Sequence, residues 1–340
     1  MNAEISPIIK EKAPEILAEI KKASSILLHC HPSPDPDSVG SALAMKFALE
    51  QLGKKATVIK GDSDIPEAFM HFPGVKEIVP KNFGEIDLSD FDLFISLDCS
   101  TPNRVSSHWK KDFIPPFKVI NIDHHRSNEM FGSINLVEEN YPATAQILFD
   151  LFVLWQIDMV EDISANLFIG IYTDTGGLKF RNTSARSYSI MSELVKKVPN
   201  FTWYVDVIDS SNSPESLAYE GAALSNIEVF LGGKLAIASV SNAVLKEKNI
   251  TDKDMGGIPI SNILRSVIGW DIDVELVEQK PGQIKVSIRT RDDKKYDLSK
   301  LAVALGGGGH KAAAGAGIVG RSLDDAKKLV VAKAKELYNL

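Results

Sequence analysis

The stretch HPSPDPDSVGSAL (residues 31–43) places a histidine and two aspartates between prolines, and then continues in small and apolar residues. It follows SSILLHC (24–30), an apolar run that is typical of a short buried strand. It leads into SALAMKFALEQLGKK (41–55), whose apolar spacing and glycine near the end predict a helix. These polar side chains therefore lie at a junction between a strand and a helix.

The backbone around Pro36 constrains the two aspartates. A proline disfavours helical backbone in the residue before it, so Asp35 is expected to be extended. In an extended chain, side chains two residues apart point to the same side, which would turn Asp35 and Asp37 toward one region. Gly40 and Ser41 would then begin the helix close to the two carboxylates.

Strands and helices alternate along this half of the chain. The apolar runs KATVIK (55–60), FDLFISLDCS (91–100) and FKVINIDHH (117–125) predict strands, and helical spacing follows at about 143–156 and 163–172. Such alternation is typical of a parallel sheet covered by helices. We therefore expect an α/β fold, in which functional groups gather beyond the carboxyl ends of the strands.

Histidines and aspartates occur where these predicted strands end, and one more aspartate follows a predicted helix in YTDTGG. The candidates are His31, Asp35, Asp37, Asp98, His124 and Asp174. Carboxylates together with imidazoles suit Mn²⁺, Fe²⁺ or Zn²⁺ better than an all-oxygen Mg²⁺ site. Two metals about 3.5–4 Å apart can clamp the attacking and leaving oxygens of a phosphoryl displacement. One aspartate at a strand end is usually a capping residue, but several clusters at one sheet edge indicate a two-metal centre.

A second region of the chain has strands and helices of its own. Its expected elements are a long helix over 214–234, strands over 235–241, 271–279 and 283–291, and a terminal helix from about Ser322. We expect a larger domain at 1–194, a linker at 195–214 and a smaller α/β domain at 215–340. The active site would lie in a cleft between the two domains.

A glycine-rich run, GGGGHKAAAGAG, precedes the terminal helix. Gly306–Gly309 have no Cβ, so their backbone N–H groups can approach a phosphate closely and form an anion-binding nest. A glycine run alone is also typical of a flexible loop. His310 and Lys311 follow it directly, and Arg289 lies on a predicted strand before it, which favours binding of a terminal phosphate or a nucleotide.

Composition excludes several classes of protein. The chain has 340 residues and a formal net charge of −7, which argues against a broad basic surface for long duplex DNA. No apolar run approaches the roughly 20 residues that span a bilayer, and the first residues predict an amphipathic helix rather than a signal peptide. Cys30 and Cys99 are too few for a disulfide framework, so we expect a cytoplasmic protein.

The motifs together resemble those of the DHH-family phosphoesterases, named for the residues that are Asp123, His124 and His125 here. The matching segments are HPSPDPDSVGS, SLDCS, NIDHHRSN and GIYTDTGGLKF, followed by SIRTR and GGGGHKAAAG, which resemble the DHH-associated C-terminal domain. Length and domain order are similar to the nanoRNase/pAp phosphatase (NrnA-type) branch. Two positions depart from the family pattern: Pro36 replaces a frequent glycine, and Arg126 replaces a frequent proline.

The resemblance implies a role for each candidate residue of the first domain. It implies one metal on His31, Asp35 and Asp98, and a second on Asp37, Asp98, His124 and Asp174, with Asp98 bridging. Asp123 would orient a ligand histidine, and His125 would face the scissile phosphate. A hydroxide held between two divalent metals, Mn²⁺ being the expected pair, would attack the phosphorus.

The second domain would bind the substrate. Its implied binding residues are Arg289, Gly307, Gly308, Gly309, His310 and Lys311, and we add Arg126 and Arg181 of the first domain as further phosphate-binding candidates. We expect short single-stranded RNA or small phosphorylated nucleotides as partners, no membrane, and we leave a homodimer open.

The resulting hypothesis is a metal-dependent phosphoesterase that hydrolyses short oligoribonucleotides, with 3′-phosphoadenosine 5′-phosphate (pAp) as a further candidate substrate. Three alternatives stay open at this point: a phosphodiesterase for cyclic di-AMP or pGpG, a RecJ-like single-strand exonuclease, and a nucleotide-binding regulator without catalysis. The acidic charge and the chain length disfavour the exonuclease, and the full set of ligand candidates disfavours the regulator.

Overall fold

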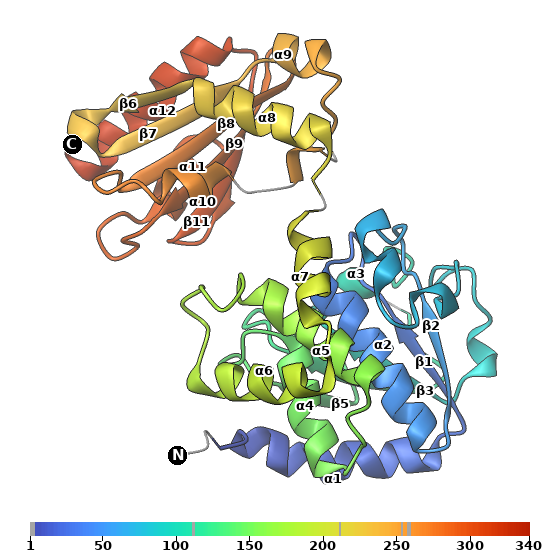
Figure 1. The fold of residues 1–340 in the computed structure, drawn as a ribbon. Helices are drawn as coiled ribbons and strands as arrows, with labels where there is room; N and C mark the ends of the chain where they lie inside the picture. Colours follow the sequence, from blue (N-terminus) through green and yellow to red (C-terminus); the bar gives the residue numbers. More distant parts are fainter. Residues whose placement is uncertain (1–3, 111–112, 211, 253, 257–259) are drawn as a thin grey trace. The chain divides into compact units, whose positions relative to one another are not determined.

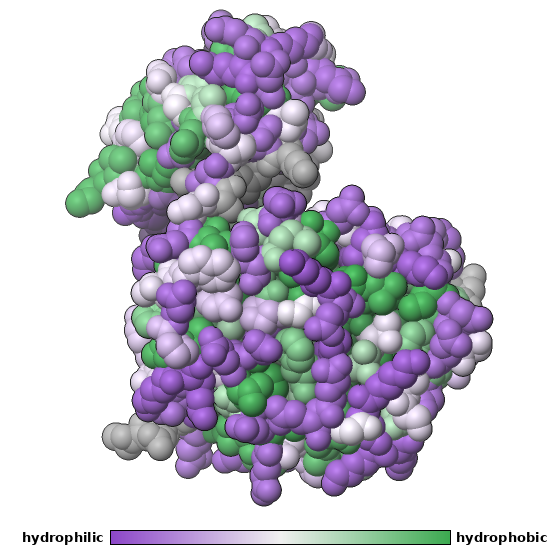
Figure 2. All heavy atoms as spheres, turned by 45° about the vertical axis from the view of Figure 1, so that its right-hand side comes forward, coloured by the Kyte–Doolittle hydropathy of each residue, from purple (hydrophilic) through white to green (hydrophobic). Residues whose placement is uncertain are grey.

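The computed structural model describes residues 4–110, 113–210, 212–252, 254–256 and 260–340. Its contacts divide the chain into two compact units, residues 1–210 and 211–340 (Figure 1). In the described ranges, no helix is both long and apolar enough to cross a membrane. Hydrophilic residues predominate on the face shown in Figure 2, and apolar residues form smaller patches between them.

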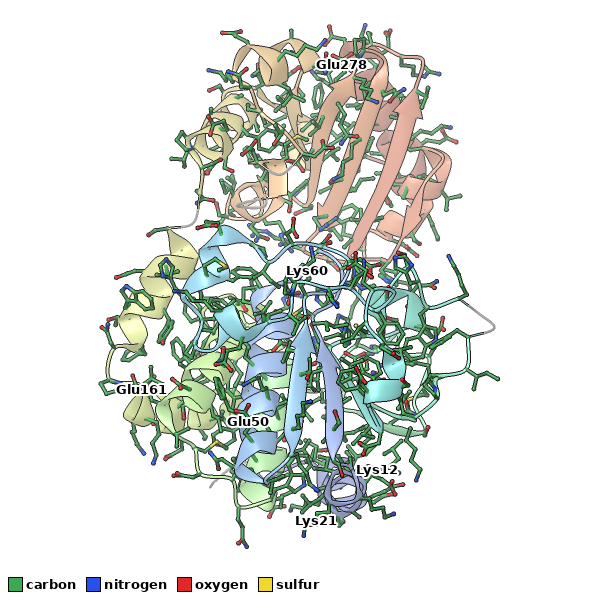
Figure 3. All side chains as sticks on the ribbon, turned by 90° about the vertical axis from the view of Figure 1, so that its right-hand side faces the viewer. Lys12, Lys21, Glu50, Lys60, Glu161 and Glu278 are labelled. Atoms are coloured by element: carbon green, nitrogen blue, oxygen red, sulfur yellow. The ribbon has the colours of Figure 1, made fainter. Side chains whose placement is uncertain are left out.

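The first unit is built on a five-stranded sheet in the order β2-β1-β3-β4-β5, and each neighbouring pair is parallel. The strands are β1 (Ser25–His29), β2 (Lys55–Ile59), β3 (Leu93–Leu97), β4 (Lys118–Asp123) and β5 (Ile134–Val137). The expected parallel α/β fold is therefore confirmed. Figure 3 shows Lys60, which follows β2, at one end of this sheet, and Lys12 and Lys21 of α1 at the other.

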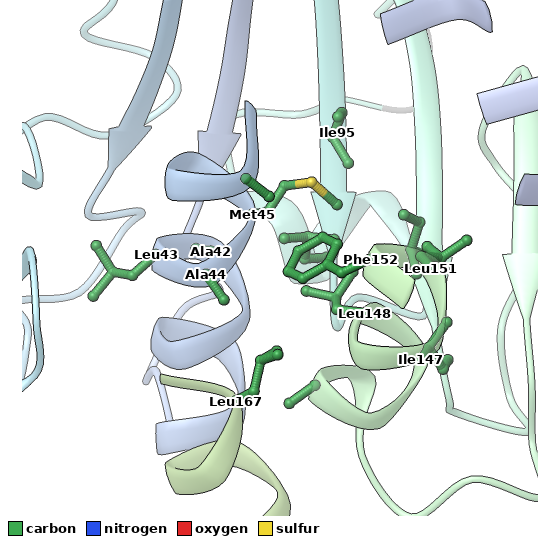
Figure 4. Close-up of a cluster of buried hydrophobic side chains, with 14 of the residues drawn as sticks. Ala42, Leu43, Ala44, Met45, Ile95, Ile147, Leu148, Leu151, Phe152 and Leu167 are labelled. Carbon is green, nitrogen blue, oxygen red and sulfur yellow. The ribbon is translucent and has the colours of Figure 1, made fainter. Parts of the chain in front are cut away.

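Helices surround this sheet, and α2, α4 and α5 pack against one another (Figure 1). The helices are α1 (Pro7–Lys22), α2 (Pro36–Gln51), α3 (Pro102–Val105), α4 (Thr144–Leu154), α5 (Glu161–Asp174), α6 (Ala185–Lys197) and α7 (Phe201–Asp209), with short 3-10 helices η1 (Glu67–His71), η2 (Val75–Glu77) and η3 (Leu88–Asp90). Figure 4 shows Met45 of α2, Ile95 of β3 and Phe152 of α4 in one buried apolar cluster. This packing fixes the helix ends relative to the sheet.

Helix α2 begins earlier than the sequence reading places it. The prediction of a start at Gly40–Ser41 is wrong, because Pro36 occupies the first turn, where a proline costs no hydrogen bond. Asp35 is extended as expected, and its carboxylate caps the helix by accepting the N–H of Ser38 at 2.9 Å. Asp37 therefore lies in the first helical turn, and strand alternation does not explain its direction.

The second unit is built on a six-stranded mixed sheet in the order β10-β11-β9-β8-β7-β6. The strands are β6 (Ile227–Phe230), β7 (Leu235–Val240), β8 (Ile272–Lys280), β9 (Gln283–Thr290), β10 (Gly308–Gly309) and β11 (Ala313–Val319). Only the β7–β8 pair among these is parallel. Apolar side chains on both faces are buried, Ile272 and Val274 in one cluster and Ala238 and Val277 in another.

Helices pack on both faces of the second sheet (Figure 1). They are α8 (Pro214–Ser225), α9 (Asn242–Glu247), α10 (Ile260–Leu264), α11 (Leu298–Ala304) and α12 (Leu323–Tyr338), with 3-10 helices η4 (Leu231–Gly233) and η5 (Asp254–Gly256). The prediction of one long helix over 214–234 is wrong, because α8 ends at Ser225 and β6 follows. The β-branched residues Ile227 and Val229 favour the strand once β7 lies beside it.

Candidate metal centre and phosphate-binding residues

Asp98 follows β3 directly and is almost completely buried. Its φ of 58° is in the left-handed region, which costs on the order of 1 kcal/mol for a residue other than glycine. Its N–H donates to the carbonyl of Ile122 at 3.1 Å, so the neighbouring strand holds this conformation. Strain of this kind at the end of a strand is typical of a functional residue.

The two carboxylate oxygens of Asp98 face two different histidines. Oδ2 lies 3.4 Å from Nε2 of His31, and Oδ1 lies 3.4 Å from Nε2 of His124. The hydroxyl of Thr144, the first residue of α4, also donates to Oδ1 at 3.0 Å. One carboxylate that is shared between two donor groups has the geometry of a bridging ligand.

The first donor group consists of His31, Asp35 and Asp98, with one ligand atom of each within 4.8 Å of the others. Nε2 of His31 lies 3.4 Å from Oδ2 of Asp35. Nδ1 of His31 lies 3.0 Å from the carbonyl oxygen of Pro32, which can only accept a hydrogen bond. Nδ1 therefore carries the proton, and Nε2 is left to face the two carboxylates.

The second donor group consists of Asp37, His124 and Asp174, again with ligand atoms within 4.8 Å of one another. Nε2 of His124 lies 3.5 Å from Oδ2 of Asp174, which is the last residue of α5. The carboxylate of Asp37 accepts the backbone N–H groups of Thr144 and Ala145 at 2.7 and 3.0 Å. Asp37 thus stabilises the N-terminus of α4 while one side of it faces His124 and Asp174.

A glycine on α5 makes room for this arrangement. A Cβ on Gly170 would lie 2.5 Å from Oδ1 of Asp37, which is closer than a Cβ comes to a neighbouring non-hydrogen atom in proteins. A Cβ on Gly40 of α2 would likewise lie 2.5 Å from the carbonyl oxygen of Asn166. The two glycines let α2 and α5 approach closely enough to bring Asp37 and Asp174 into one group.

Asp123 and His125 form a hydrogen-bonded pair beside these groups. Oδ1 of the fully buried Asp123 accepts from Nδ1 of His125 at 2.7 Å, and Oδ2 accepts from the side-chain amide of Asn128 at 2.6 Å. The ring that Asp123 orients in the structure is therefore that of His125, whereas the resemblance implies that Asp123 orients a ligand histidine. The His125 side chain is 42% exposed, so Asp123 fixes a ring that can still meet a substrate.

Opposite shifts in pKa show how strongly the groups interact. Burial opposes protonation of His31, but its contacts with Asp35 and Asp98 outweigh burial and raise its pKa to about 10. The pKa of His124 rises to about 10 in the same way through Asp98 and Asp37. Burial also works against the charge of Asp98, but the two histidines hold its pKa far below the usual range.

The carboxylates of Asp174 and Asp37 show the opposite shift, toward holding a proton. Burial and the charges of Asp37 and Asp98 raise the pKa of Asp174 to about 9. Burial and the charge of Asp98 raise that of Asp37 to about 7. Without a cation, the cluster therefore keeps protons that a divalent metal would displace. Nitrogen and oxygen donors of these kinds could hold divalent cations, and the two carboxylate oxygens of Asp98 each face one histidine, His31 of the first group and His124 of the second.

Sequence reasoning did not single out two residues that support the site. Thr144 bonds Asp98, and Asn128 bonds Asp123. Asn128 lies inside the NIDHHRSN motif, and Thr144 lies at the expected start of a helix. The sequence pattern pointed to residues near Thr144 and Asn128. The contacts of these two residues themselves depend on how α4 and β4 pack.

The glycine-rich run of the second unit forms a strand pair rather than an open nest. Gly308 and Gly309 make up β10, which pairs with β11. The N–H of Gly307 donates to the carbonyl of Ala302 at 2.7 Å, and that of Gly306 to Val303 at 3.0 Å. The N–H groups of Gly306 and Gly307 are therefore already bonded within the unit and do not contribute to the anion nest that the sequence predicts over Gly306–Gly309.

The side chains around the glycine run are accessible. His310 and Lys311 are exposed, and Arg289 is partly exposed on β9, where its Nη1 donates to the carbonyl of Ile288 at 2.9 Å. Lys311 also lines a cavity of about 440 Å³. Three further lysines that sequence reasoning did not single out share that cavity: Lys294, Lys295 and Lys300.

Arg126 and Arg181 lie on the surface of the first unit. Nε of Arg126 donates to the Glu139 carboxylate at 2.8 Å, and the Arg126 side chain is 82% exposed. Arg181 is exposed in the turn that follows Asp174. Both cations are available to solvent, and both lie within eight residues of a candidate ligand in the sequence.

Comparison with known families identifies the two units. Residues 25–171 match the N-terminal domain of the DHH family, and residues 232–336 match the DHHA1 domain. The chain belongs to the DHH family of phosphoesterases, which are hydrolases of phosphoric ester bonds. The family is divalent-metal dependent, which agrees with the donor groups around Asp98.

Individual relatives cover nearly the whole chain. It is 31% identical to the bifunctional oligoribonuclease and PAP phosphatase NrnA of Thermus thermophilus, over 94% of this chain and 93% of the relative. It is 28% identical to a probable bifunctional oligoribonuclease and PAP phosphatase NrnA of Streptococcus mutans, over 88% of this chain and 92% of the relative. The solved structure of an exopolyphosphatase-related protein from Bacteroides fragilis has the same fold, with a TM-score of 0.84, 22% identity and 97% coverage of both chains.

Proposed function

We propose that this phosphoesterase hydrolyses short oligoribonucleotides and also removes a phosphate from pAp. The observation that carries the proposal is the position of Asp98 between His31 and His124, which gives two donor groups with one shared carboxylate. A pair of cations on such groups suits displacement at phosphorus. Relatives named as oligoribonuclease and PAP phosphatase, which align over almost the full chain, support these two substrates.

The ligand assignment follows the two donor groups. His31, Asp35 and Asp98 would hold one cation, and Asp37, His124 and Asp174 the other, joined by Asp98 through its Oδ1 beside His124. Mixed imidazole and carboxylate ligands suit Mn²⁺, Fe²⁺ or Zn²⁺, and we propose Mn²⁺ as the metal. When bound, the pair supplies an activated water and neutralises the charge on the phosphate.

His125 and Asp123 complete the reacting centre. The hydrogen bond from His125 to Asp123 raises the pKa of the imidazole, so the ring tends to stay protonated. A protonated ring donates a hydrogen bond to a phosphate oxygen and stabilises the charge that develops there. Asp123 holds the ring in position for that contact and is a positioning residue.

The second unit would bind a phosphate of the substrate. Arg289 and His310 offer cationic or neutral donors at the glycine strand pair, and the exposed Gly308 lets a phosphate approach the backbone. Lys311, Gly307 and Gly309 border the same place. Each such phosphate contact would help to position the substrate, because a misplacement of about 1 Å can cost ~10²-fold in rate.

The test is a length series of one RNA sequence, from 2 to 20 nucleotides, with Mn²⁺ and fixed salt. Parallel assays use pAp, cyclic di-AMP and pGpG. We expect kcat/KM to fall beyond about five nucleotides, because a chain with a net charge of −7 lacks the basic track that guides a long strand. Equal or rising efficiency on the 20-mer would reject the proposal in favour of an exonuclease that uses long strands. Exclusive hydrolysis of cyclic di-AMP or pGpG would reject it in favour of a cyclic-dinucleotide pathway enzyme.

A substitution in the second unit separates binding from catalysis. We expect His310→Ala to raise KM for substrates with a terminal phosphate by about tenfold, the loss of one charge-assisted hydrogen bond. Mn²⁺ stoichiometry and kcat should stay as in the unchanged chain. The matched control is Lys333→Ala, a partly exposed cation of α12 that pairs with Glu336. A loss of metal in His310→Ala would make His310 a ligand and contradict the division of roles.

A further inference from the structure

The turn that follows Asp174 has an unusual backbone. Gly176, Gly177 and Leu178 have φ values of 57°, 67° and 65°, so three consecutive residues are in the left-handed region. Leucine pays about 1–2 kcal/mol for this conformation, since its Cβ approaches the following carbonyl. Such a turn persists only where other contacts determine it.

Hydrogen bonds hold the turn in place. The carbonyl of Thr175 accepts the N–H groups of Lys179 and Phe180, both at 2.9 Å. The Thr175 hydroxyl accepts the N–H of Leu178 at 3.0 Å, and the Tyr188 hydroxyl donates to the carbonyl of Leu178 at 3.1 Å. The strained turn is thus rigid, and it fixes the direction in which Phe180 leaves the backbone.

Phe180 is a large apolar side chain that the turn keeps at the surface. Its ring lies so close to Gly176 that a Cβ there would be 2.4 Å from Cε1. The residue is nevertheless 48% exposed. One part of the ring therefore rests on the glycine backbone, and the rest faces solvent in a fixed orientation.

Phe180 follows a candidate metal ligand in the sequence and is flanked by two cations. Gly176 is two residues after Asp174, so their Cα atoms are at most about 7.6 Å apart. Lys179 and Arg181 flank the ring, and both are exposed. Single-stranded nucleic acid is commonly bound by an aromatic face for the base with cations beside it for the backbone.

Other exposed aromatic side chains of the unit have partners that account for them. Trp203 is 38% exposed, but its ring packs against His71 and Tyr204. Tyr188 is 56% exposed, and its hydroxyl bonds Leu178. The contact of Phe180 with Gly176, in contrast, leaves about half of the residue uncovered, and Gly176 is two residues from the metal-ligand candidate Asp174.

We propose that Phe180 is a stacking surface for the nucleobase next to the scissile phosphate, with Lys179 and Arg181 contacting the sugar-phosphate backbone. This inference rests on the proposed function, because it names the part of a nucleotide that the first unit reads. Every base has a flat face, so stacking tolerates all four bases. The enzyme should accordingly show little base preference at this position and bind a nucleotide better than its sugar phosphate alone.

The experiment compares AMP with ribose 5-phosphate, which carries the same phosphate without a base. Calorimetry with the Mn²⁺-loaded full chain gives Kd for both ligands. We expect AMP to bind more tightly than ribose 5-phosphate by about 5- to 100-fold, the range for one stacked base. Phe180→Ala should remove that difference, and Phe180→Trp should keep it.

Two further variants exclude a merely structural effect. Phe180→Leu keeps an apolar side chain against Gly176 without an aromatic face, so it should lose most of the AMP preference while its thermal unfolding stays unchanged. Leu154→Ala removes a 38% exposed apolar side chain at the far end of α4, about 15 Å along the helix from Thr144, and should keep the full preference.

The outcomes separate this inference from the proposed function. Equal binding of AMP and ribose 5-phosphate by the unchanged chain, or an undiminished preference in Phe180→Ala, would overturn stacking at Phe180 even if short RNA is hydrolysed. A preference that disappears in Phe180→Ala would support stacking even if the unchanged chain hydrolyses no RNA, and only the proposed substrate would then fail.

Discussion

Each of the two units buries an aspartate completely or nearly so, and the two side chains have opposite surroundings. Asp98 of the first unit contacts two histidines and the hydroxyl of Thr144. Asp273, on β8 of the second unit, is 0% exposed, and neither of its carboxylate oxygens has a hydrogen-bond partner in the described ranges. Burial alone therefore does not mark a metal ligand.

The difference is visible in the pKa values. The histidines hold the pKa of Asp98 far below its usual range despite burial. Burial raises the pKa of Asp273 to about 7, although the charges of Arg265 and Arg291 lower it in part. Convergence of histidines on a buried carboxylate indicates a site for a cation. A buried carboxylate without such neighbours is a cost to stability.

The largest expected effect comes from changing the carboxylate with many partners. Asp98→Asn should lower kcat by about 10³-fold or more, because the shared ligand organises both donor groups. Mn²⁺ bound per chain, measured by plasma mass spectrometry, should fall as well. Asp90→Asn, an exposed aspartate of the same unit, is the control and should match the unchanged chain. Normal metal content with normal turnover in Asp98→Asn would refute the bridging assignment.

The buried carboxylate of Asp273 should affect the stability of the second unit and the pH dependence of that stability. An unfolded aspartate has a pKa of about 3.9, so the native chain binds the Asp273 proton more tightly. Stability should therefore fall as pH rises from about 4 to about 7, by about 2–4 kcal/mol from this residue. Asp273→Asn should remove that slope and raise the Tm of the second unit more at pH 8 than at pH 4.

Calorimetric melts at the two pH values test this, with the exposed Asp293→Asn as control. An Asp273→Asn variant whose Tm differs from that of the unchanged chain by the same amount at both pH values would show that the carboxylate has a partner after all. Asp273 would then no longer be an example of a buried aspartate without a hydrogen-bond partner, in contrast to Asp98.

A smaller effect is expected from the residue that only positions a histidine. Asp123→Asn keeps the shape but loses the charge that orients His125, so kcat should fall about 10- to 100-fold. KM and Mn²⁺ stoichiometry should change little, in contrast to Asp98→Asn. A metal loss as large as in Asp98→Asn would place Asp123 among the ligands.

The smallest effect concerns an ion pair on the surface. Arg126 bonds Glu139 with both side chains largely in solvent, and such pairs contribute about 0–1 kcal/mol. Arg126→Ala should shift the free energy of unfolding by less than about 0.5 kcal/mol, as urea titration would measure. If KM rises while the free energy of unfolding stays the same, Arg126 has a role in substrate binding. A change in the free energy of unfolding well above about 0.5 kcal/mol would contradict the view of Arg126 as a surface residue.

The ends of β1, β3 and β4 could be predicted because each strand is a short apolar run that stops at a histidine or an aspartate. Their gathering at one edge follows from parallel pairing, which strand–helix alternation indicates. The start of α2 was predicted wrongly, although Asp35 and Pro36 form a frequent capping and first-turn pair. The prediction takes Pro36 only as a constraint on the backbone of Asp35, and not as a residue of the first helical turn.

Other features depend on contacts between distant segments. Gly308, Gly309 and the alanines of β11 have low strand propensity, and they form strands only because β9 pairs with β11. The strand β5 is four residues long, too short for its alternation to stand out. Asp123 bonds the ring of His125 and not that of His124, and this depends on the side-chain directions at the end of β4.

The four consecutive glycines of the second unit have different freedoms to change over evolutionary time. Gly306 has a φ of 83°, and a Cβ on Gly307 would lie 2.1 Å from the carbonyl oxygen of Gly315. Gly309 is restricted in both ways, with a φ of 143° and a Cβ position 2.5 Å from Ala314. Gly308 has open space around it and no such φ. In a saturation library that is selected only for folding, position 308 alone of the four should accept alanine. If the same library selected for growth retains glycine at position 308, a ligand must approach the backbone closely there.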